Sequence, residues 1–226
     1  MQELDAIELF QWLDSTNRIA IYGWYDTFGS CIWEGVDWRN RYKGTIGKIA
    51  DNHINREFYA DKPNQKWYTD VTEFNLRGEK CYLSPILDGF NGEVISYNTS
   101  KSPNLEQIND MLNKGFEGKN LEGLIFHSDQ GWQYQHKTYQ KWLKDKGIKQ
   151  SFSRKGNCMD NSPMENFFGI MKNEMYYGYT YNTKEELLTA MKEYITYYNN
   201  ERINIKRKGL SPLAYRLESL NQLSLA

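Results

Sequence analysis

Apolar, β-branched and aromatic residues gather in three consecutive stretches between residues 67 and 99, a pattern typical of β-strands. The stretches span residues 67–74, 80–90 and 93–99, and each is rich in β-branched and aromatic side chains. The segments between them carry the turn signals RGE and NG. Strands joined by such short turns run antiparallel, so an antiparallel meander is predicted.

After residue 103 the pattern changes to helices that alternate with short apolar runs. From Leu105 to Phe116 the apolar residues recur at helical spacing. The later elements predicted are strands at 124–127 and 148–153 and helices at 136–146, from 163 onward, and at 184–199. The order β-β-β-α-β-α-β-α predicts an α/β fold in which helices flank a mixed five-stranded sheet.

Three carboxylates occupy places that this order of elements can bring together. Asp70 lies in the first strand, Asp129 follows the fourth, and Glu165 lies in the first turn of the helix after the loop RKGNCMDNSP. Three converged acids repel one another and need cations to stay ionised. Carboxylates are also the ligands that Mg²⁺ prefers. The pattern therefore predicts a site for Mg²⁺, with Mn²⁺ able to substitute, and phosphoryl-transfer chemistry.

The residues around these acids resemble a known family. The segments WYTDVTEF, LIFHSDQGWQYQ, SFSRKGNCMDNSPMENFFGIMKNE and YITYYNNERINIKRKGLSPLAYR are similar, in this order, to blocks of bacterial insertion-sequence transposases of the two-reading-frame type. The catalytic core of that family is similar to retroviral integrase. Thirty-five residues separate Asp129 from Glu165, the interval by which the integrase-like group is known.

The resemblance implies an RNase H-like fold, preceded here by an atypical N-terminal appendage. It implies that Asp70, Asp129 and Glu165 are the catalytic, metal-binding acids. It also implies that Lys172, seven residues after Glu165, touches DNA near the reacting phosphate. His127 is predicted to pack or to form hydrogen bonds rather than to act as a general base, because metal ions would activate the nucleophile.

The start of the helix that bears Glu165 carries its own signals. Ser162 is placed to cap this helix, and Pro163 fits its first position. The helix dipole is expected to lower the pKa of Glu165. Lys172 returns to nearly the same face two turns later, and Gly169 leaves that face open to a DNA backbone.

Charge is distributed unevenly along a chain whose net charge is −1. Residues 1–40 carry seven acids against two bases, whereas residues 41–226 carry twenty-two acids against twenty-six bases. Clustered cations can neutralise phosphates without reading sequence, although a solvated charged face is the alternative interpretation. The candidate DNA-binding residues are Lys172, Arg154, Lys155, Asn161, Arg202, Lys206, Arg207 and Lys208.

Composition divides the chain into four parts. Residues 1–40 form an acidic segment with four of the seven tryptophans, 41–66 a polar linker, 67–216 the catalytic core with a C-terminal helix, and 217–226 a tail. The first segment is either a divergent helical appendage or sequence joined from another frame or start site. The three cysteines form no CxxC pair, so a zinc module and a disulfide framework are not expected.

Together these features predict the catalytic subunit of a DNA transposase. Such an enzyme hydrolyses a phosphodiester at an element end, and the freed 3′-hydroxyl then attacks another phosphodiester. A nuclease of the same fold without strand transfer is one alternative. An inactive remnant that binds DNA or multimerises, and so modulates a full-length transposase, is another. The expected partners are element-end and target DNA, a separate helix-turn-helix chain or upstream frame, and further copies of the chain. A bacterial cytoplasmic, nucleoid-associated location without membrane contact is expected.

Overall fold

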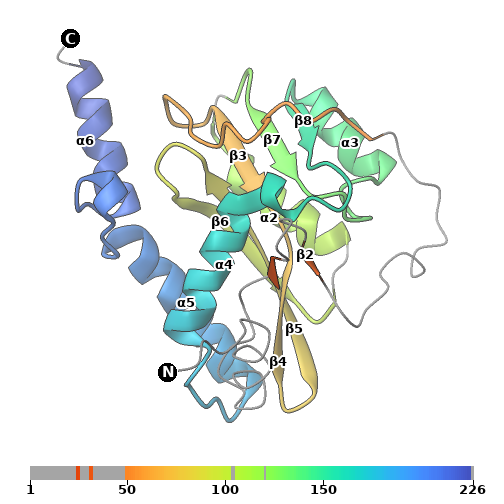
Figure 1. The fold of residues 1–226 in the computed structure, drawn as a ribbon, viewed down its shortest axis with the longest axis vertical. Coiled ribbons are helices and arrows are strands. Elements are labelled where there is room, and N and C mark those ends of the chain that lie inside the picture. Colours follow the sequence, from red (N-terminus) through yellow and green to blue (C-terminus); the bar gives the residue numbers. More distant parts are fainter. Residues whose placement is uncertain (1–23, 26–30, 33–48, 103–104, 120, 225–226) are drawn as a thin grey trace, which may run out of the picture.

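Helices cover both faces of one mixed β-sheet in this protein (Figure 1). The structure is a computed structural model that describes residues 24–25, 31–32, 49–102, 105–119 and 121–224. Most of the acidic segment 1–40 lies outside the described residues. The described part of that segment is an antiparallel pair formed by β1 (Trp24–Tyr25) and β2 (Cys31–Ile32).

Six strands form the main sheet. They are β3 (Lys66–Thr69), β4 (Thr72–Leu76), β5 (Glu79–Asp88), β6 (Val94–Ser100), β7 (Ile125–Ser128) and β8 (Lys149–Phe152). Both β3 and β4 pair with β5 in one register, so they are two halves of one interrupted strand. The six strands therefore occupy five positions, in the order β6, β5, β3 with β4, β7, β8. The predicted five-stranded mixed sheet is confirmed.

The interruption between β3 and β4 falls at Asp70. A single strand over residues 67–74 was predicted, and this detail is wrong. The register that places Thr69 opposite Ile86 and Thr72 opposite Leu83 places Asp70 opposite Pro85. Proline has no N–H to donate to a neighbouring strand, so the hydrogen-bond ladder is broken there.

Helices on the two faces bury two separate apolar clusters. On one face α2 (Leu105–Phe116) and α3 (Lys137–Asp145) pack on side chains that include Trp67. On the other face α4 (Ser162–Met175) and α5 (Lys184–Asn200) pack on Tyr68 and its neighbours. Adjacent residues of a strand point to opposite faces, which is why Trp67 and Tyr68 lie in different clusters. Within the described residues, no helix is both long and apolar enough to cross a membrane.

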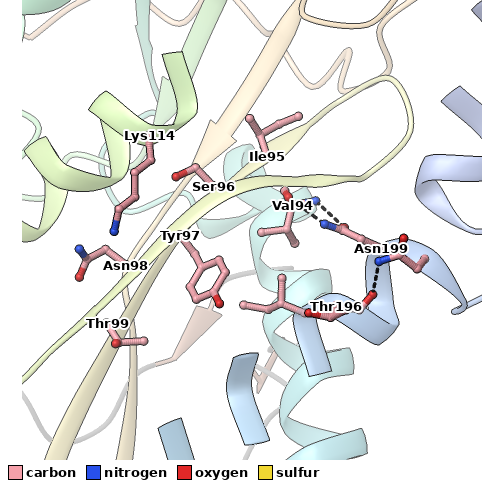
Figure 2. Close-up of a pocket in the computed structure, with 11 residues that line it drawn as sticks. Val94, Ile95, Ser96, Tyr97, Asn98, Thr99, Lys114, Thr196 and Asn199 are labelled. Atoms are coloured by element: carbon pink, nitrogen blue, oxygen red, sulfur yellow. Dashed lines mark hydrogen bonds between the residues drawn. The ribbon is translucent and has the colours of Figure 1, made fainter. Parts of the chain in front are cut away.

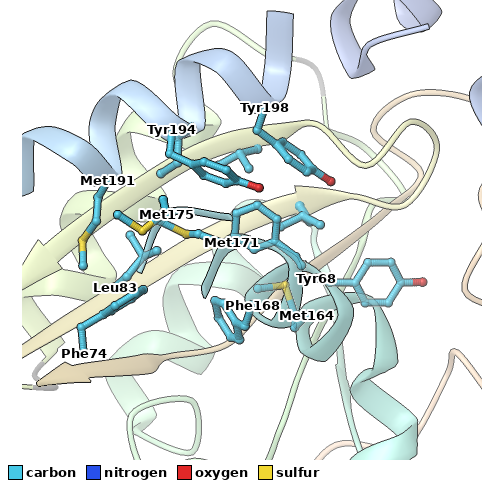
Figure 3. Close-up of a cluster of buried hydrophobic side chains, with 14 of the residues drawn as sticks. Tyr68, Phe74, Leu83, Met164, Phe168, Met171, Met175, Met191, Tyr194 and Tyr198 are labelled. Carbon is cyan, nitrogen blue, oxygen red and sulfur yellow. The ribbon is translucent and has the colours of Figure 1, made fainter. Parts of the chain in front are cut away.

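The cluster beneath α4 and α5 is rich in methionine and aromatic side chains (Figure 3). Met164, Met171 and Met175 of α4 and Met191 of α5 all belong to this cluster. Methionine is flexible and fills irregular gaps between large rings. This packing fixes α4, and with it Glu165, against the sheet.

The last helix, α6 (Pro212–Ser224), is fastened to the far end of the sheet. Arg216 forms ion pairs with Asp88 and Glu93, and the Asn91 side chain donates to the Pro212 carbonyl at 2.9 Å. The helix continues across residue 216, where the sequence predicted that the core ends.

In the predicted linker, Ile54 is buried in the cluster beneath α4 and α5.

The edge strand β6 borders a shallow hollow of about 600 Å³ beside α5 (Figure 2). Asn199 of α5 closes one end of this edge. It accepts from the Val94 N–H at 2.9 Å and donates to the Val94 carbonyl at 2.9 Å. None of the three predicted acids lines the hollow, which is therefore separate from the candidate site.

Candidate active site

Asp70 and Asp129 extend from the ends of neighbouring parallel strands. Strand β3 pairs with β7 so that Thr69 lies opposite Ser128. The next residues along each chain segment are Asp70 and Asp129. The carboxyl ends of strands are where open α/β sheets usually bind ligands. The sheet register thus brings together two acids that are 59 residues apart in sequence.

Hydrogen bonds hold both aspartates. The Asp70 carboxylate accepts from the Val71 N–H at 2.7 Å and from the Asn161 side-chain amide at 3.2 Å. The Asp129 carboxylate accepts from the Gly131 N–H at 2.9 Å. A Cβ at position 131 would stand 2.9 Å from an oxygen of Asp129, so this close approach favours glycine. The carboxylates are therefore oriented before any substrate arrives.

The two aspartates raise each other's energy in the ionised form. Burial raises the pKa of Asp70 well above its ordinary value, and the negative charges of Asp129 and Glu165 raise it further. Burial also raises the pKa of Asp129. Among the described residues, no lysine, arginine or histidine forms an ion pair with either. The site therefore concentrates negative charge that a cation would stabilise.

Glu165 lies in the first turn of α4, as predicted, and its side chain is exposed. Its pKa is raised by desolvation, so the expected lowering by the helix dipole is wrong. Although the side chain is exposed as a whole, the protein around the carboxylate partly desolvates it. Ser162 does not cap the helix either, because its hydroxyl donates to the Met159 carbonyl at 2.6 Å. Pro163 does lie at the helix start.

The arrangement is ready for a cation but is not a closed cage. In the part of the chain that the structure describes, no three His, Cys, Asp or Glu side chains are already gathered as ligands for one metal. Asp70 and Asp129 lie together, whereas Glu165 remains exposed beside them. Mg²⁺ keeps several of its waters and needs only a few carboxylates, so the donor set fits this ion.

His127 is buried one residue before the end of β7. Its ring nitrogens lie 2.8 Å from the Ser151 hydroxyl and 2.9 Å from the Asp160 carbonyl. Because burial lowers the pKa of His127 to about 4, the ring is neutral at pH 7. These contacts agree with the predicted packing and hydrogen-bonding role.

Lys172 lies two turns after Glu165 on α4. Its ammonium group is 5.1 Å from the centre of the Phe74 ring, and burial lowers its pKa while the charge of Glu73 opposes that change. At Gly169 an added Cβ would meet open space, in accord with the open face predicted between Glu165 and Lys172.

Three of the other candidate DNA-binding cations are engaged within the protein. Arg154 pairs with Asp160 and Arg202 with Glu174, whereas Arg207 is buried and donates to backbone carbonyls. The exposed cations of the set are Arg154, despite its ion pair, and Lys155, Lys206 and Lys208. Lys206 contacts the hydroxyl of Tyr59 at 3.1 Å, and Lys208 lies 3.9 Å from Glu218.

Sequence reasoning assigned Asn161 to DNA and gave Asp160 no part in the site. In the structure the Asn161 side chain is buried against Asp70, and Asp160 is buried beside it. The signal for Asp160 was the basic residue Arg154 within its own loop, which can pair with it. Its further partners, Asn52 and Arg56, lie more than a hundred residues earlier in the chain and carried no signal.

The order of the sheet and its flanking helices defines an RNase H-like fold. The HTLV-2 integrase catalytic core domain in complex with magnesium (trimeric form) has this fold, with a TM-score of 0.54 at 20% identity. The likeness covers 70% of this chain and 99% of the integrase core.

Sequence comparisons identify the family. Two family models, both described as Integrase core domain, match residues 60–158 and 165–220. An uncharacterized transposase-like protein of Haemophilus influenzae is 54% identical over 182 residues, which are 80% of this chain and 83% of that protein. The putative transposase InsK for insertion sequence element IS150 of Escherichia coli K12 is 51% identical over 176 residues, 77% of this chain and 62% of InsK. The chain belongs to the insertion-sequence transposases with an integrase core domain.

Proposed function

We propose that this protein catalyses metal-dependent hydrolysis of phosphodiester bonds at element ends, followed by attack of the freed 3′-hydroxyl on a phosphodiester of target DNA, which joins the two strands and releases a target 3′-hydroxyl. The observation that carries the proposal is the pairing of Thr69 with Ser128. This pairing brings Asp70 and Asp129 to adjacent strand ends, beside the helix that bears Glu165. Membership in the family of integrase-core transposases supports the proposal independently.

The proposed metal ligands are Asp70, Asp129 and Glu165, and the proposed metal is Mg²⁺, with Mn²⁺ able to substitute. The raised pKa values of the two half-buried aspartates support this assignment, because a bound cation would relieve their repulsion. Bound divalent metal supplies activation of an attacking oxygen and stabilisation of a leaving oxygen. The exposed carboxylate of Glu165 completes the set when it turns toward the aspartates.

The protein's own groups set the geometry of the reaction. Backbone N–H groups of Val71 and Gly131 restrain the two aspartates, so the orientation of each carboxylate is set in advance. Lys172 is proposed to contact the phosphate next to the scissile bond. Partial burial favours this contact, because an ammonium group interacts more strongly with phosphate where water is excluded.

Recognition of particular element ends is proposed to come from outside this chain. The exposed cations Lys155, Lys206 and Lys208 can hold phosphates, and such contacts position DNA without specifying its sequence. We assign sequence recognition to a separate helix-turn-helix chain or upstream frame, and catalysis to several copies of this chain on DNA at the bacterial nucleoid. Competition binding at physiological salt tests this: a preference above about tenfold for end DNA by this chain alone would contradict it.

Incubation of the purified chain with end-containing DNA and Mg²⁺ tests the reaction itself. We expect nicked strands first and joined products later, with neither in EDTA nor with Asp129→Asn. Nicking without joining would favour a nuclease. DNA binding without nicking in Mg²⁺ or Mn²⁺ would favour an inactive remnant.

A further inference from the structure

Asp160 is a buried carboxylate outside the three proposed metal ligands, and it lies in the loop between β8 and α4. Its side chain is 0% exposed. Arg154 binds it through two parallel bonds, from Nε to Oδ2 at 2.7 Å and from Nη2 to Oδ1 at 2.7 Å. The Arg154 N–H donates to Oδ2 at 3.0 Å. A bidentate arginine contact fixes direction as well as distance, so the loop is closed on itself.

The segment before β3 fastens the same carboxylate from a distant part of the chain. Arg56 donates from Nε to Oδ1 at 3.0 Å, and Asn52 donates from Nδ2 to Oδ2 at 3.1 Å. Arg56 also donates from Nη2 to the Asn157 side-chain oxygen at 3.3 Å. Residues 52–56 are therefore tied to the loop that leads to Glu165.

The backbone of Asp160 is held from the sheet as well. The His53 N–H donates to the Ser151 hydroxyl at 2.9 Å, and this hydroxyl lies 2.8 Å from His127 Nδ1. His127 Nε2 lies 2.9 Å from the Asp160 carbonyl. A carbonyl can only accept, so Nε2 carries the proton and Nδ1 accepts from Ser151. These bonds connect the loop to β7 and β8.

Asn161 connects this restrained loop to Asp70 of the three-acid site. It follows Asp160, is 3% exposed, and donates from Nδ2 to Asp70 Oδ2 at 3.2 Å. Its own Oδ1 is buried and has no hydrogen-bond partner among the described residues. An unpaired buried oxygen opposes folding. A contribution to stability therefore does not explain why an asparagine is buried at position 161. Its hydrogen bond, which orients Asp70, does explain it.

We propose that Asp160 is a positioning residue that acts on the three-acid site through Asn161. Its ion pairs with Arg154 and Arg56 fix the backbone at 160–161. This places the Asn161 amide against Asp70 and sets the start of the helix that bears Glu165. Residues 52–56 then belong to the active centre rather than to a linker. The assignment rests on the proposed function.

The first test compares kinetics of single variants. Asp160→Asn keeps the size of the side chain and removes its charge, and Asn161→Ala removes the amide that touches Asp70. Nicking kcat is expected to fall about 10- to 100-fold in both, as for other groups that orient metal ligands. The KM for DNA should stay near wild type in both. The melting temperature should stay near wild type in Asn161→Ala and fall in Asp160→Asn, because that change removes the buried charge that pairs with Arg154 and Arg56. Asp145→Asn, an exposed acid at the end of α3, is the matched control and should leave kcat unchanged.

A double-mutant cycle separates action through Asn161 from a general loss of structure. Asp160→Asn combined with Asn161→Ala should lose no more activity than either single change, because both break one chain of contacts. Asp160→Asn combined with Lys172→Ala should lose the product of the two single effects. A folded Asp160→Asn protein with wild-type kcat, or multiplied losses with Asn161→Ala, would overturn the proposal.

A second variant covers the case in which Asp160→Asn does not fold. Arg56→Gln changes a side chain that is 43% exposed, so this variant should fold. In a double-mutant cycle, Arg56→Gln combined with Asn161→Ala should lose no more activity than the stronger single change. Hydrogen–deuterium exchange adds a readout that needs no activity: residues 154–161 should exchange faster in Arg56→Gln than in wild type. If the wild-type chain nicks no DNA with any metal, the proposed function fails. Unchanged exchange in Arg56→Gln would separately reject the positioning role.

Discussion

Two kinds of aspartate are withdrawn from water in this protein: Asp88 and Asp160 are buried, whereas Asp70 and Asp129 are half-buried. Asp88 and Asp160 both have arginine partners, Arg216 for the first and Arg154 for the second. Asp88 also accepts from two backbone N–H groups. Asp70 instead lies beside another half-buried acid, Asp129. Hydrogen bonds from Arg154 hold the pKa of Asp160 well below its usual range, whereas burial and a neighbouring charge hold that of Asp70 well above it.

Burial alone therefore does not reveal what a carboxylate does in this fold. The compensated aspartates join segments that are far apart in sequence, from Asp88 to Arg216 and from Asp160 to Arg56. The uncompensated pair has no cationic partner among the described residues and leaves negative charge unpaired. Such an arrangement disfavours the empty site and favours a bound cation. Charge balance separates the proposed catalytic acids from the structural ones.

The largest effect is expected from removal of an uncompensated acid. Asp70→Ala, Asp129→Ala or Glu165→Ala should each lower nicking and joining by several powers of ten, because each removes a proposed metal ligand. The folded state should persist, since no arginine loses its partner. Quantified product formation, with circular dichroism as the folding control, checks this. If a variant retains more than about a tenth of wild-type activity, the acid that it replaces is not an essential metal ligand.

Disruption of a compensated pair should instead affect stability. Arg216→Ala leaves Asp88 buried without its cation, and breaking a buried pair in this way costs about 3–5 kcal/mol. Urea unfolding measures the free-energy change. Lys208→Ala is the control, since Lys208 is 67% exposed and lies 3.9 Å from Glu218 on the same helix. That surface pair contributes about 0–1 kcal/mol. Equal losses for both variants would contradict the distinction.

Metal should stabilise the protein through the uncompensated pair. At ten to a hundred times its dissociation constant, Mg²⁺ should add about 1–3 kcal/mol to the free energy of unfolding. Asp129→Asn should abolish this increment and stabilise the metal-free protein, because it removes the repulsion with Asp70. Thermal melting with Mg²⁺ and with EDTA measures both effects. A melting temperature that responds to neither metal nor mutation would argue against the site.

The pH dependence of the metal-free protein should show the same contrast. The folded pKa of Asp70 is raised, so the folded state binds its proton more tightly than the unfolded state does. Stability from Asp70 therefore increases as pH falls through its raised pKa toward the ordinary aspartate value of 3.8. Asp160 acts oppositely, and its contribution is lost below 3.8. Asp70→Asn should remove the gain on mild acidification, as measured by urea unfolding between neutral pH and this range.

The smallest effect concerns a cation rather than an acid. Lys172→Ala should weaken DNA binding and lower the salt slope by about one unit, as loss of one phosphate contact requires. Metal-induced stabilisation should stay nearly unchanged. Lys192→Ala, an exposed lysine on α5, serves as the control. Fluorescence anisotropy over a salt series measures how steeply DNA affinity falls with salt concentration. Equal slopes for the two variants would show that Lys172 makes no phosphate contact that an ordinary surface lysine lacks.

The order of strands and helices could be predicted because local periodicity encodes it. Trp67 and Tyr68 face opposite clusters, as strand alternation requires. The break at Asp70 could not be predicted in this way. It depends on Pro85 arriving opposite, and the pairing register is not visible in a single stretch of sequence.

The same limit applies to the candidate site. The position of Asp129 after a strand followed from an apolar run, and that of Glu165 from helix-start signals. Asp70 was predicted inside a strand, whereas the structure has it where the strand is interrupted. The partners of Asp160 did not follow, because Arg56 lies 104 residues away in sequence. The direction of the Glu165 pKa shift was also missed, since desolvation depends on atoms that only the folded chain brings near.

The amide of Asn199 has a consequence for how copies of this chain can associate. An open sheet edge offers free N–H and C=O groups to any strand that approaches, including the same strand of another copy. At Val94 the Asn199 side chain already occupies both groups, as a short piece of neighbouring strand would. A foreign strand that docks along β6 loses its pairing at the first residue. The edge thus resists accidental sheet-to-sheet polymerisation in a protein proposed to gather in several copies on one DNA.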